Sequence, residues 1–280
     1  MRPRPGEAHL TLDRIQPYIM EEDVHCAATR VIALENTLNG SIFSLDEIRR
    51  IGEYTRQHNL ILHCDGARLW NASAETGIPL SEWCKPFQTV SLCLSKGIGA
   101  PVGSIMVGPK PIIKQARHYR KLFGGGWRQS GPLAAAALVG IQSVFLPSAH
   151  LGGRSQMQLD HENARWFAAT LPARVKNMRV VNNVETNMVF VDVRHALEGL
   201  EVDKLVRACE VINNEREKKG AQASVRIASF GYAYDSPDKE PNLEDHSYVL
   251  RLVFHHLTPR KGCELLIQTF EEALHRLSKQ

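Results

Sequence analysis

The sequence predicts an α/β protein whose first part holds a mainly parallel sheet and whose last part is a smaller α+β region. Three short apolar runs, at residues 29–34, 60–63 and 89–94, are typical of buried strands. A stretch with helical spacing separates the first two runs, and the order strand, helix, strand favours a parallel sheet covered by helices. Beyond residue 150 the pattern changes, so we expect a large domain at residues 1–150 and a small one at residues 151–280.

The clearest single element is a helix expected over residues 44–59. Ser44 is suited to cap its N-terminus, and Glu47 follows three residues later, which is the spacing of a capping box. Ile48 and Ile51 then follow at helical spacing and predict the face that packs against the sheet.

The other predicted elements follow in chain order. A strand at residues 103–108 comes after a tight Gly/Pro turn, and the Ala-rich helix at residues 132–145 is expected to be buried, because small side chains allow close packing. Further helices are expected at residues 111–122, 155–171 and 259–277, strands at 188–193 and 249–254, and a polar surface loop at 232–246.

The bulk composition excludes several classes of protein. Of the 280 residues 43% are hydrophobic, which is enough for a sizeable core, and the net charge of +4 is too small and too dispersed to indicate nucleic-acid binding. No apolar run approaches the roughly 18 residues that span a bilayer, and the basic N-terminus lacks the apolar segment of a secretory signal. The six cysteines form no C-x-x-C pair, so we expect reduced thiols in a cytoplasmic protein and no metal site.

Asp65 and Arg68 directly follow the second apolar run, in the segment HCDGARLWNA. Ligands bind at the carboxyl ends of the strands in open α/β sheets, so both side chains stand where a ligand is expected. A carboxylate at this position can hold a protonated ring nitrogen of a cofactor. The alternative interpretation is an Asx turn or a helix cap at the end of a strand.

Lys96 follows the third apolar run, between Ser95 and Gly97 in the segment SLCLSKGIGAPVGS. Lysine is rarely buried without a purpose, and a lysine held in a dry pocket becomes a nucleophile toward aldehydes. The glycines that follow would let the backbone approach a bulky cofactor. A surface lysine on a loop is the alternative interpretation of this motif taken alone.

The two motifs together are more specific than either one. An aspartate followed 31 residues later by a lysine, each at the end of one of two consecutive strands, is the arrangement of fold-type I enzymes that use pyridoxal 5'-phosphate (PLP). The chain resembles the low-specificity L-threonine aldolases in four segments, LENTLNGSIFSLDEI, HCDGARLWNA, SLCLSKGIGAPVGS and RKLFGGGWRQSGPLAAAAL. The resemblance runs from about Leu10 to the C-terminus, and the form Glu-Asn-Thr-Leu-Asn-Gly at residues 35–40 most resembles fungal members.

The resemblance implies a role for each matching residue. Lys96 would be the catalytic residue that bonds PLP covalently, Asp65 would pair with the pyridine nitrogen, and Arg68 would bond the phenolic oxygen. Arg128 would lie near the cofactor phosphate. Arg251, in LRLVFHH, would bind the substrate carboxylate with its bidentate fork, although an arginine exposed on a sheet face is the alternative interpretation.

The activity that the resemblance implies is a retro-aldol cleavage. L-threonine, allo-threonine or another β-hydroxy-α-amino acid would give glycine and an aldehyde, in a homodimer or homotetramer. Another PLP reaction on the same fold, such as amino-acid racemisation, is the alternative enzyme. A catalytically inactive paralogue that acts as a partner subunit is the alternative outside catalysis.

Two departures from the family pattern bear on the activity. The family has a further N-terminal segment with a Gly-rich phosphate loop and a histidine that stacks on the ring, so we expect a truncated chain with weak or no activity. Leu38 stands where many bacterial members have a histidine associated with the substrate hydroxyl. His25 is a candidate substitute for that histidine, and a solvated loop histidine is its alternative.

Overall fold

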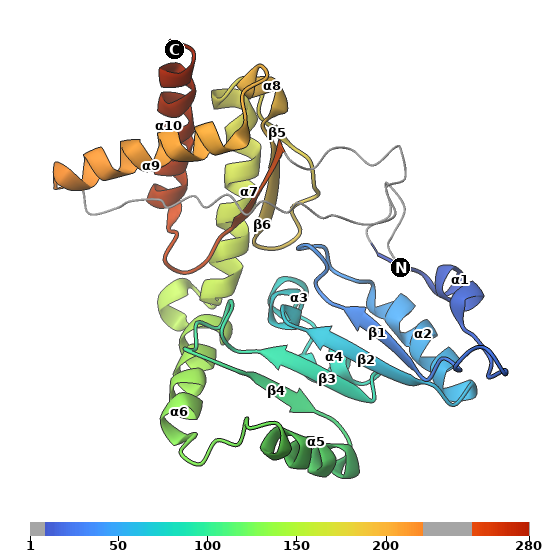
Figure 1. Ribbon diagram of the computed structural model, residues 1–280. Helices are drawn as coiled ribbons and strands as arrows, with labels where there is room; N and C mark the ends of the chain where they lie inside the picture. The colour runs from blue at the N-terminus through green and yellow to red at the C-terminus, as the bar shows by residue number, and fades with distance from the viewer. Residues whose placement is uncertain (1–8, 221–247, 280) are drawn as a thin grey trace. The chain divides into compact units, whose positions relative to one another are not determined.

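The computed structural model describes residues 9–220 and 248–279 (Figure 1). Contacts group the chain into two compact units, Met1–Leu159 and Asp160–Gln280, and each has its own hydrophobic core. Compact units are not in themselves independent domains, so the division into domains after residue 150 stays a prediction. The predicted surface loop at residues 232–246 lies outside the described residues.

A four-stranded sheet forms the centre of the first unit. Its strands lie in the order β1 (Val31–Glu35), β2 (Ile61–Gly66), β3 (Thr89–Cys93) and β4 (Ser104–Val107). The first three strands are parallel to one another, and β4 pairs with β3 in the antiparallel direction. The prediction of a mainly parallel sheet is therefore confirmed.

Helices connect the parallel strands and cover one face of this sheet (Figure 1). They are α2 (Leu45–Gln57) between β1 and β2, then α3 (Leu69–Thr76) and α4 (Leu80–Cys84) between β2 and β3. The strand side chains on the helix-covered face are buried with these helices; they are Ile32, Leu34, Leu62, Cys64, Val90 and Leu92. On the opposite face Val31 and Ile61 remain 50% and 39% exposed, as the alternation of side chains along a strand requires.

Ser44 caps α2 as predicted. Its hydroxyl accepts a hydrogen bond from the backbone N–H of Glu47 at 3.4 Å, which satisfies one of the free donors at the start of the helix. The Glu47 carboxylate accepts a hydrogen bond from the backbone N–H of Leu12 at 2.7 Å. This residue therefore ties the short helix α1 (Leu12–Ile15) to α2, a role that the capping-box pattern does not predict.

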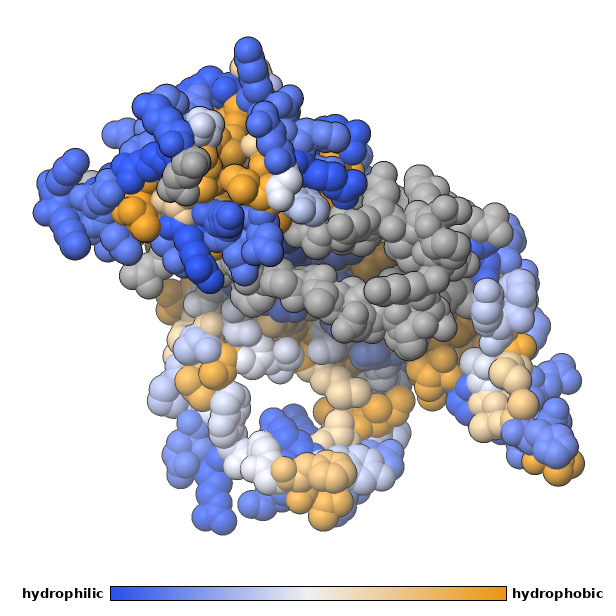
Figure 2. Space-filling view, turned by 45° about the horizontal axis from the view of Figure 1, so that its top comes forward, coloured by the Kyte–Doolittle hydropathy of each residue, from blue (hydrophilic) through white to orange (hydrophobic). Residues whose placement is uncertain are grey.

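The remaining helices of the first unit are α5 (Lys110–Leu122) and α6 (Gly131–Gly140), which continues as a π-helical turn at Ile141–Phe145. The expectation that the Ala-rich segment is buried is wrong, because Ala137 is the only buried residue of α6. Its small side chains permit close packing on every side, but the described chain packs against one stripe of the helix. Figure 2 shows hydrophobic residues at the surface beside hydrophilic ones, and Leu138 on α6 is 56% exposed.

The second unit has a three-stranded antiparallel sheet in the order β5 (Arg179–Val180), β6 (Met188–Asp192) and β7 (Val249–Val253). Its helices are α7 (Gln156–Arg174), which begins before the unit, the short α8 (Arg194–Leu197), α9 (Val202–Lys218) and α10 (Arg260–Leu277). Helix α9 was not predicted, although Leu205, Cys209 and Ile212 recur at helical spacing and are buried.

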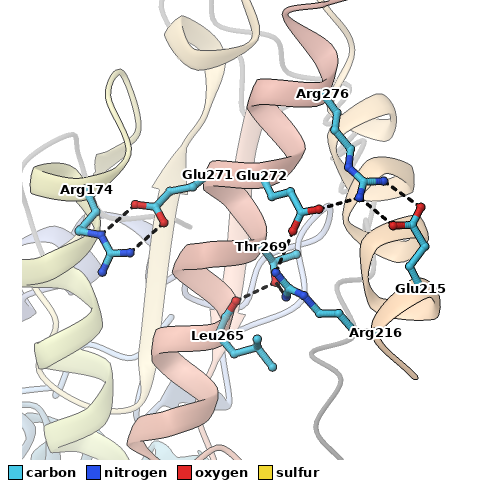
Figure 3. Close-up of polar contacts among 8 residues, drawn as sticks. All are labelled: Arg174, Glu215, Arg216, Leu265, Thr269, Glu271, Glu272 and Arg276. Carbon is cyan, nitrogen blue, oxygen red and sulfur yellow. Dashed lines mark hydrogen bonds and ion pairs between the residues drawn. The ribbon is translucent and has the colours of Figure 1, made fainter. Parts of the chain in front are cut away.

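Arginine–glutamate pairs join the helices of the second unit (Figure 3). Arg174 on α7 donates two hydrogen bonds of 2.8 Å to the carboxylate of Glu271 on α10. On the other side of α10, Arg276 donates to both carboxylate oxygens of Glu215 on α9, at 2.9 and 2.7 Å. Bidentate pairs of this kind fix the geometry of the helices that they connect.

Three features expected from the sequence can be compared with the described residues. All six cysteines are free thiols. Within residues 9–220 and 248–279, no helix is long and apolar enough to cross a membrane. The same residues contain no group of three or more His, Cys, Asp and Glu side chains that could hold a metal ion.

Candidate active site

Two carboxyl groups end neighbouring strands of the first sheet. Glu35 is the last residue of β1, and its partner in the parallel register is Asp65, near the end of β2. Asp65 is in turn the register partner of Ser91 on β3. Partners in register lie on the same face of a sheet, and neighbouring strands are about 4.8 Å apart. The register therefore places both carboxyl groups side by side at the edge where the sequence predicts a ligand.

Asp65 is exposed, and its Oδ1 accepts a hydrogen bond from the backbone N–H of Ala67 at 3.0 Å. This is the local turn that was the alternative interpretation of the motif. A carboxylate has two oxygens and several acceptor positions, so this bond is compatible with a second partner. The turn thus orients the carboxylate without excluding a ligand.

Arg68 and Lys96 bring positive charge to the same edge. Arg68 is the half-buried residue that precedes α3, and Lys96 lies in the loop that follows β3. The backbone N–H of Leu94 donates to the carbonyl of Gly103 at 3.0 Å and closes this loop at its base. Lys96 is exposed, so the expectation of a dry pocket round it is wrong for the described part of the chain.

The pKa of Glu35 depends on the charges of all three of these residues. Glu35 is exposed at the end of its strand, and partial desolvation together with the neighbouring charge of Asp65 raises its pKa above the ordinary range, while Arg68 and Lys96 lower it. The prediction of site residues did not include Glu35. The signal that could have identified it is its place as the last residue of the first predicted strand, in register with Asp65 once the two strands are paired.

Two polar groups without partners lie next to Glu35. The side chains of Asn36 and Thr37 are each 1% exposed. Asn36 Oδ1 accepts a hydrogen bond from the backbone N–H of Phe43 at 3.1 Å. Its Nδ2 group and the Thr37 Oγ1 have no hydrogen-bond partner among the described residues. Buried polar groups are normally paired, so these two indicate a place for a polar ligand or a bound water.

The other residues singled out in the sequence belong to other segments of the chain. Arg128 is exposed in the segment between α5 and α6. Arg251 is exposed on β7 of the second unit, in register with Phe190. Leu38 exchanges two backbone hydrogen bonds with Ser41, of 3.1 and 2.9 Å, in the tight turn after β1. The geometry thus brings together Asp65, Arg68 and Lys96 of the predicted set.

The family model and the curated relatives that match this chain agree with one another. Residues 2–196 match the beta-eliminating lyase family. The low specificity L-threonine aldolase of Saccharomyces cerevisiae is 40% identical over 230 residues, which are 80% of this chain and 54% of the yeast protein. The low-specificity L-threonine aldolase of Candida albicans is 40% identical over 197 residues, 69% of this chain and 50% of that protein. The chain spans about half the length of these curated relatives.

Among solved structures, the threonine aldolase of Leishmania major is similar to this chain with a TM-score of 0.64 and 16% sequence identity. The match covers 95% of this chain and 67% of the Leishmania chain. It confirms the predicted fold-type I architecture, and the curated relatives confirm the predicted resemblance. By the match over residues 2–196, the chain belongs to the beta-eliminating lyase family.

Proposed function

We propose that the protein is a PLP-dependent aldehyde-lyase that cleaves L-threonine, allo-threonine or another β-hydroxy-α-amino acid to glycine and an aldehyde. The observation that carries the proposal is the placement of Asp65 near the end of β2, Arg68 directly before α3, and Lys96 in the loop after the neighbouring parallel strand β3. Relatives at 40% identity that are named low-specificity L-threonine aldolases support the same reaction.

The residues at this edge suit the chemistry of PLP. The amine of Lys96 can bond the aldehyde of the cofactor, the carboxylate of Asp65 can hold a protonated ring nitrogen, and Arg68 can donate to the phenolic oxygen. The buried Nδ2 of Asn36 and Oγ1 of Thr37, which directly follow Glu35 in the chain, have no partner among the described residues. When bound, PLP would supply the electron sink that makes cleavage at the α-carbon of an amino acid possible.

Each of the site residues would then have a separate role. Asp65 would keep the ring nitrogen protonated by its negative charge, and Lys96 would be the amine that holds the cofactor and that carries a proton at its Nζ when it is free. Arg251 would bind the carboxylate of the substrate through two parallel hydrogen bonds. Arg128 would contribute positive charge for the cofactor phosphate.

The compartment and the oligomeric state of the enzyme are part of the proposal. Six free thiols suit a reducing compartment, and we place the protein in the cytoplasm. We also propose a homodimer or homotetramer, in line with the resemblance to its family. Sedimentation of the purified protein would measure the oligomeric state.

The proposed activity is tested by pairing a cofactor measurement with a product measurement. We expect the purified protein, incubated with PLP, to show a visible absorption band of the bound cofactor, and to release detectable glycine and acetaldehyde from L-threonine, even where the turnover is weak. Lys96→Ala should lose both. The matched control is Lys85→Ala, which removes a lysine paired with Glu82 on the surface and should retain both. If the protein racemises threonine and releases no glycine, the proposed aldolase activity is wrong and the protein is a racemase.

A further inference from the structure

The loop that carries Lys96, residues 94–103, is anchored on both sides of the lysine. Before it, the indole Nε1 of Trp70 on α3 donates a hydrogen bond of 3.0 Å to the carbonyl oxygen of Cys93, the last residue of β3. After it, the side chain of Ile98 is buried in the core of the first unit. Lys96 is therefore an exposed residue on a loop whose flanks are fixed to the interior.

Met157, in the first turn of α7, packs against the backbone directly after the lysine. Its side chain is buried, and a Cβ added to Gly97 would lie 3.1 Å from its Cε. The same Cβ would lie 3.6 Å from Oδ1 of Asn71 on α3. Gly97 thus lies between two helices, and the absence of a side chain lets Met157 approach the backbone next to Lys96.

Gln158 fixes the start of α7 to α3. Its Nε2 donates a hydrogen bond of 3.0 Å to the carbonyl oxygen of Ala74 on α3. Its Oε1 accepts a hydrogen bond from the backbone N–H of Ser155 at 2.8 Å, and the Ser155 hydroxyl accepts one from the backbone N–H of Gln158 at 3.2 Å. This reciprocal pair is a capping box. One side chain therefore both caps α7 and joins it to α3.

Helix α3 also begins at the other half of the proposed site. It starts directly after Arg68, in the turn that follows Asp65. The same helix thus supports the proposed partners of the cofactor ring and, through the start of α7, the loop of Lys96. A single cofactor has to meet all of these groups at once, so their separation must be held nearly constant.

We propose that Met157 and Gln158 are positioning residues for Lys96. Gln158 sets the place of α7 on α3, and Met157 transmits that place to Gly97. The loop is thereby fixed relative to the turn that carries Asp65. This inference rests on the proposed function, because that function assigns Lys96 as the residue that bonds the cofactor.

The first test needs no cofactor. Hydrogen–deuterium exchange of peptides that span residues 94–103 is measured by mass spectrometry in the PLP-free protein. Backbone N–H groups of this loop, including those of Gly99 and Ala100, donate within it, so their exchange reports its opening. Met157→Ala leaves a cavity beside Gly97 and should speed this exchange about tenfold. Met157→Leu conserves the volume and should exchange close to the wild-type rate.

Gln158→Glu separates the two roles of this side chain. The carboxylate can still accept from the Ser155 N–H and keep the capping box, but it has no donor for the carbonyl of Ala74. The loop should therefore exchange faster although the cap of α7 is intact. Ile48→Ala is the matched control, because it opens a cavity on α2 in the same hydrophobic core. It should lower the unfolding temperature without changing the exchange of residues 94–103.

The second test measures PLP binding from the visible absorption of the bound cofactor. The dissociation constant should rise about three- to tenfold in Met157→Ala and Gln158→Glu, since the amine is no longer held at its place opposite the other groups. Met157→Leu and Ile48→Ala should bind PLP as the wild type does. A merely structural role would instead lower the unfolding temperature of Met157→Ala and Ile48→Ala and leave both affinities unchanged.

The outcomes separate this inference from the proposed function. Wild-type exchange of residues 94–103 in Met157→Ala and Gln158→Glu would overturn the inference and leave the PLP site intact. Faster exchange with unchanged PLP affinity would also overturn it, because the two residues would then hold the loop without positioning the lysine. Failure of the wild type to bind PLP at Lys96 would overturn the proposed function, and the exchange measurement would still decide whether α7 holds the loop. If Met157→Ala does not fold, Gln158→Glu decides, because it leaves the core filled.

Discussion

Glu35 and Asp65 are register partners at the ends of two parallel strands, β1 and β2. The pairing places two carboxyl groups side by side at the carboxyl ends of these strands. The pKa of Glu35 is raised by desolvation and then by the charge of Asp65. Such a pair is costly unless cations offset it. Arg68 and Lys96 supply those cations, and both lower the pKa of Glu35.

Borohydride labelling should locate the cofactor on one lysine. Reduction of the PLP-loaded protein fixes the bond between the cofactor and the amine that holds it, and peptide mapping should find the pyridoxyl group on Lys96. Lys96→Ala should lose the label, whereas Lys85→Ala should keep it. A pyridoxyl group on any lysine other than Lys96 would refute the assignment.

Asp65→Asn should reduce turnover strongly while the protein still folds. The amide keeps the size and can still accept the hydrogen bond from Ala67, but it no longer supplies the charge that holds a ring nitrogen protonated. Loss of one preorganised electrostatic contact typically costs about 10² to 10³ in rate. Asp46→Asn, on the exposed start of α2, is the matched control for steady-state kinetics. Equal turnover in the two variants would contradict the role of Asp65.

Arg251→Lys should weaken substrate binding and leave cofactor binding unchanged. Lysine keeps the charge but loses the two parallel donors that match a carboxylate. We expect KM for L-threonine to rise about tenfold or more, from the loss of a charge-assisted hydrogen bond of roughly 1.5 to 3 kcal/mol. Arg179→Lys, exposed on β5 of the same sheet, is the control. Loss of the PLP absorption band in Arg251→Lys would show that this arginine serves the cofactor or the fold.

Much of the fold could be predicted from local patterns, because apolar runs and caps are local signals. Ser44 and the apolar residues after it were enough to place α2. Glu35 was missed because its importance depends on the register of two strands, which no single strand encodes. The exposure of Lys96 and of α6 also could not be predicted, since it depends on which surfaces the rest of the chain covers. Helix α9 was missed although Leu205, Cys209 and Ile212 recur at helical spacing, so the local signal for this helix was present in the sequence.

The ion pair between Arg276 and Glu215 should make part of the stability depend on pH. Hydrogen bonds from Arg276 lower the pKa of Glu215, so the stabilisation is present above the ordinary glutamate range and is lost as the pH falls through the folded-state pKa. Arg276→Gln should lower the urea midpoint at neutral pH, and the difference from wild type should shrink below about pH 4 and at high salt. Arg207→Gln, exposed on α9, is the control. A difference that is independent of pH and salt would mean that Arg276 acts by packing.

Gly140→Ala should disturb the loop of Lys96 from a distance in sequence. Gly140 is the last residue of α6, and a Cβ at this position would overlap the carbonyl oxygen of Ile98 and lie 2.9 Å from its Cγ2. Ile98 is buried two residues after Lys96, so either α6 or the loop that carries the lysine has to shift. Overpacking of this kind typically costs about 1 to 3 kcal/mol.

Gly131→Ala is the matched control in the same helix, because a Cβ there meets nothing within 4 Å. We expect Gly140→Ala to unfold at lower temperature and to give less pyridoxyl-labelled Lys96, with Gly131→Ala close to wild type in both measurements. Equal labelling in the two variants would show that the contact between α6 and Ile98 supports the fold without positioning the lysine.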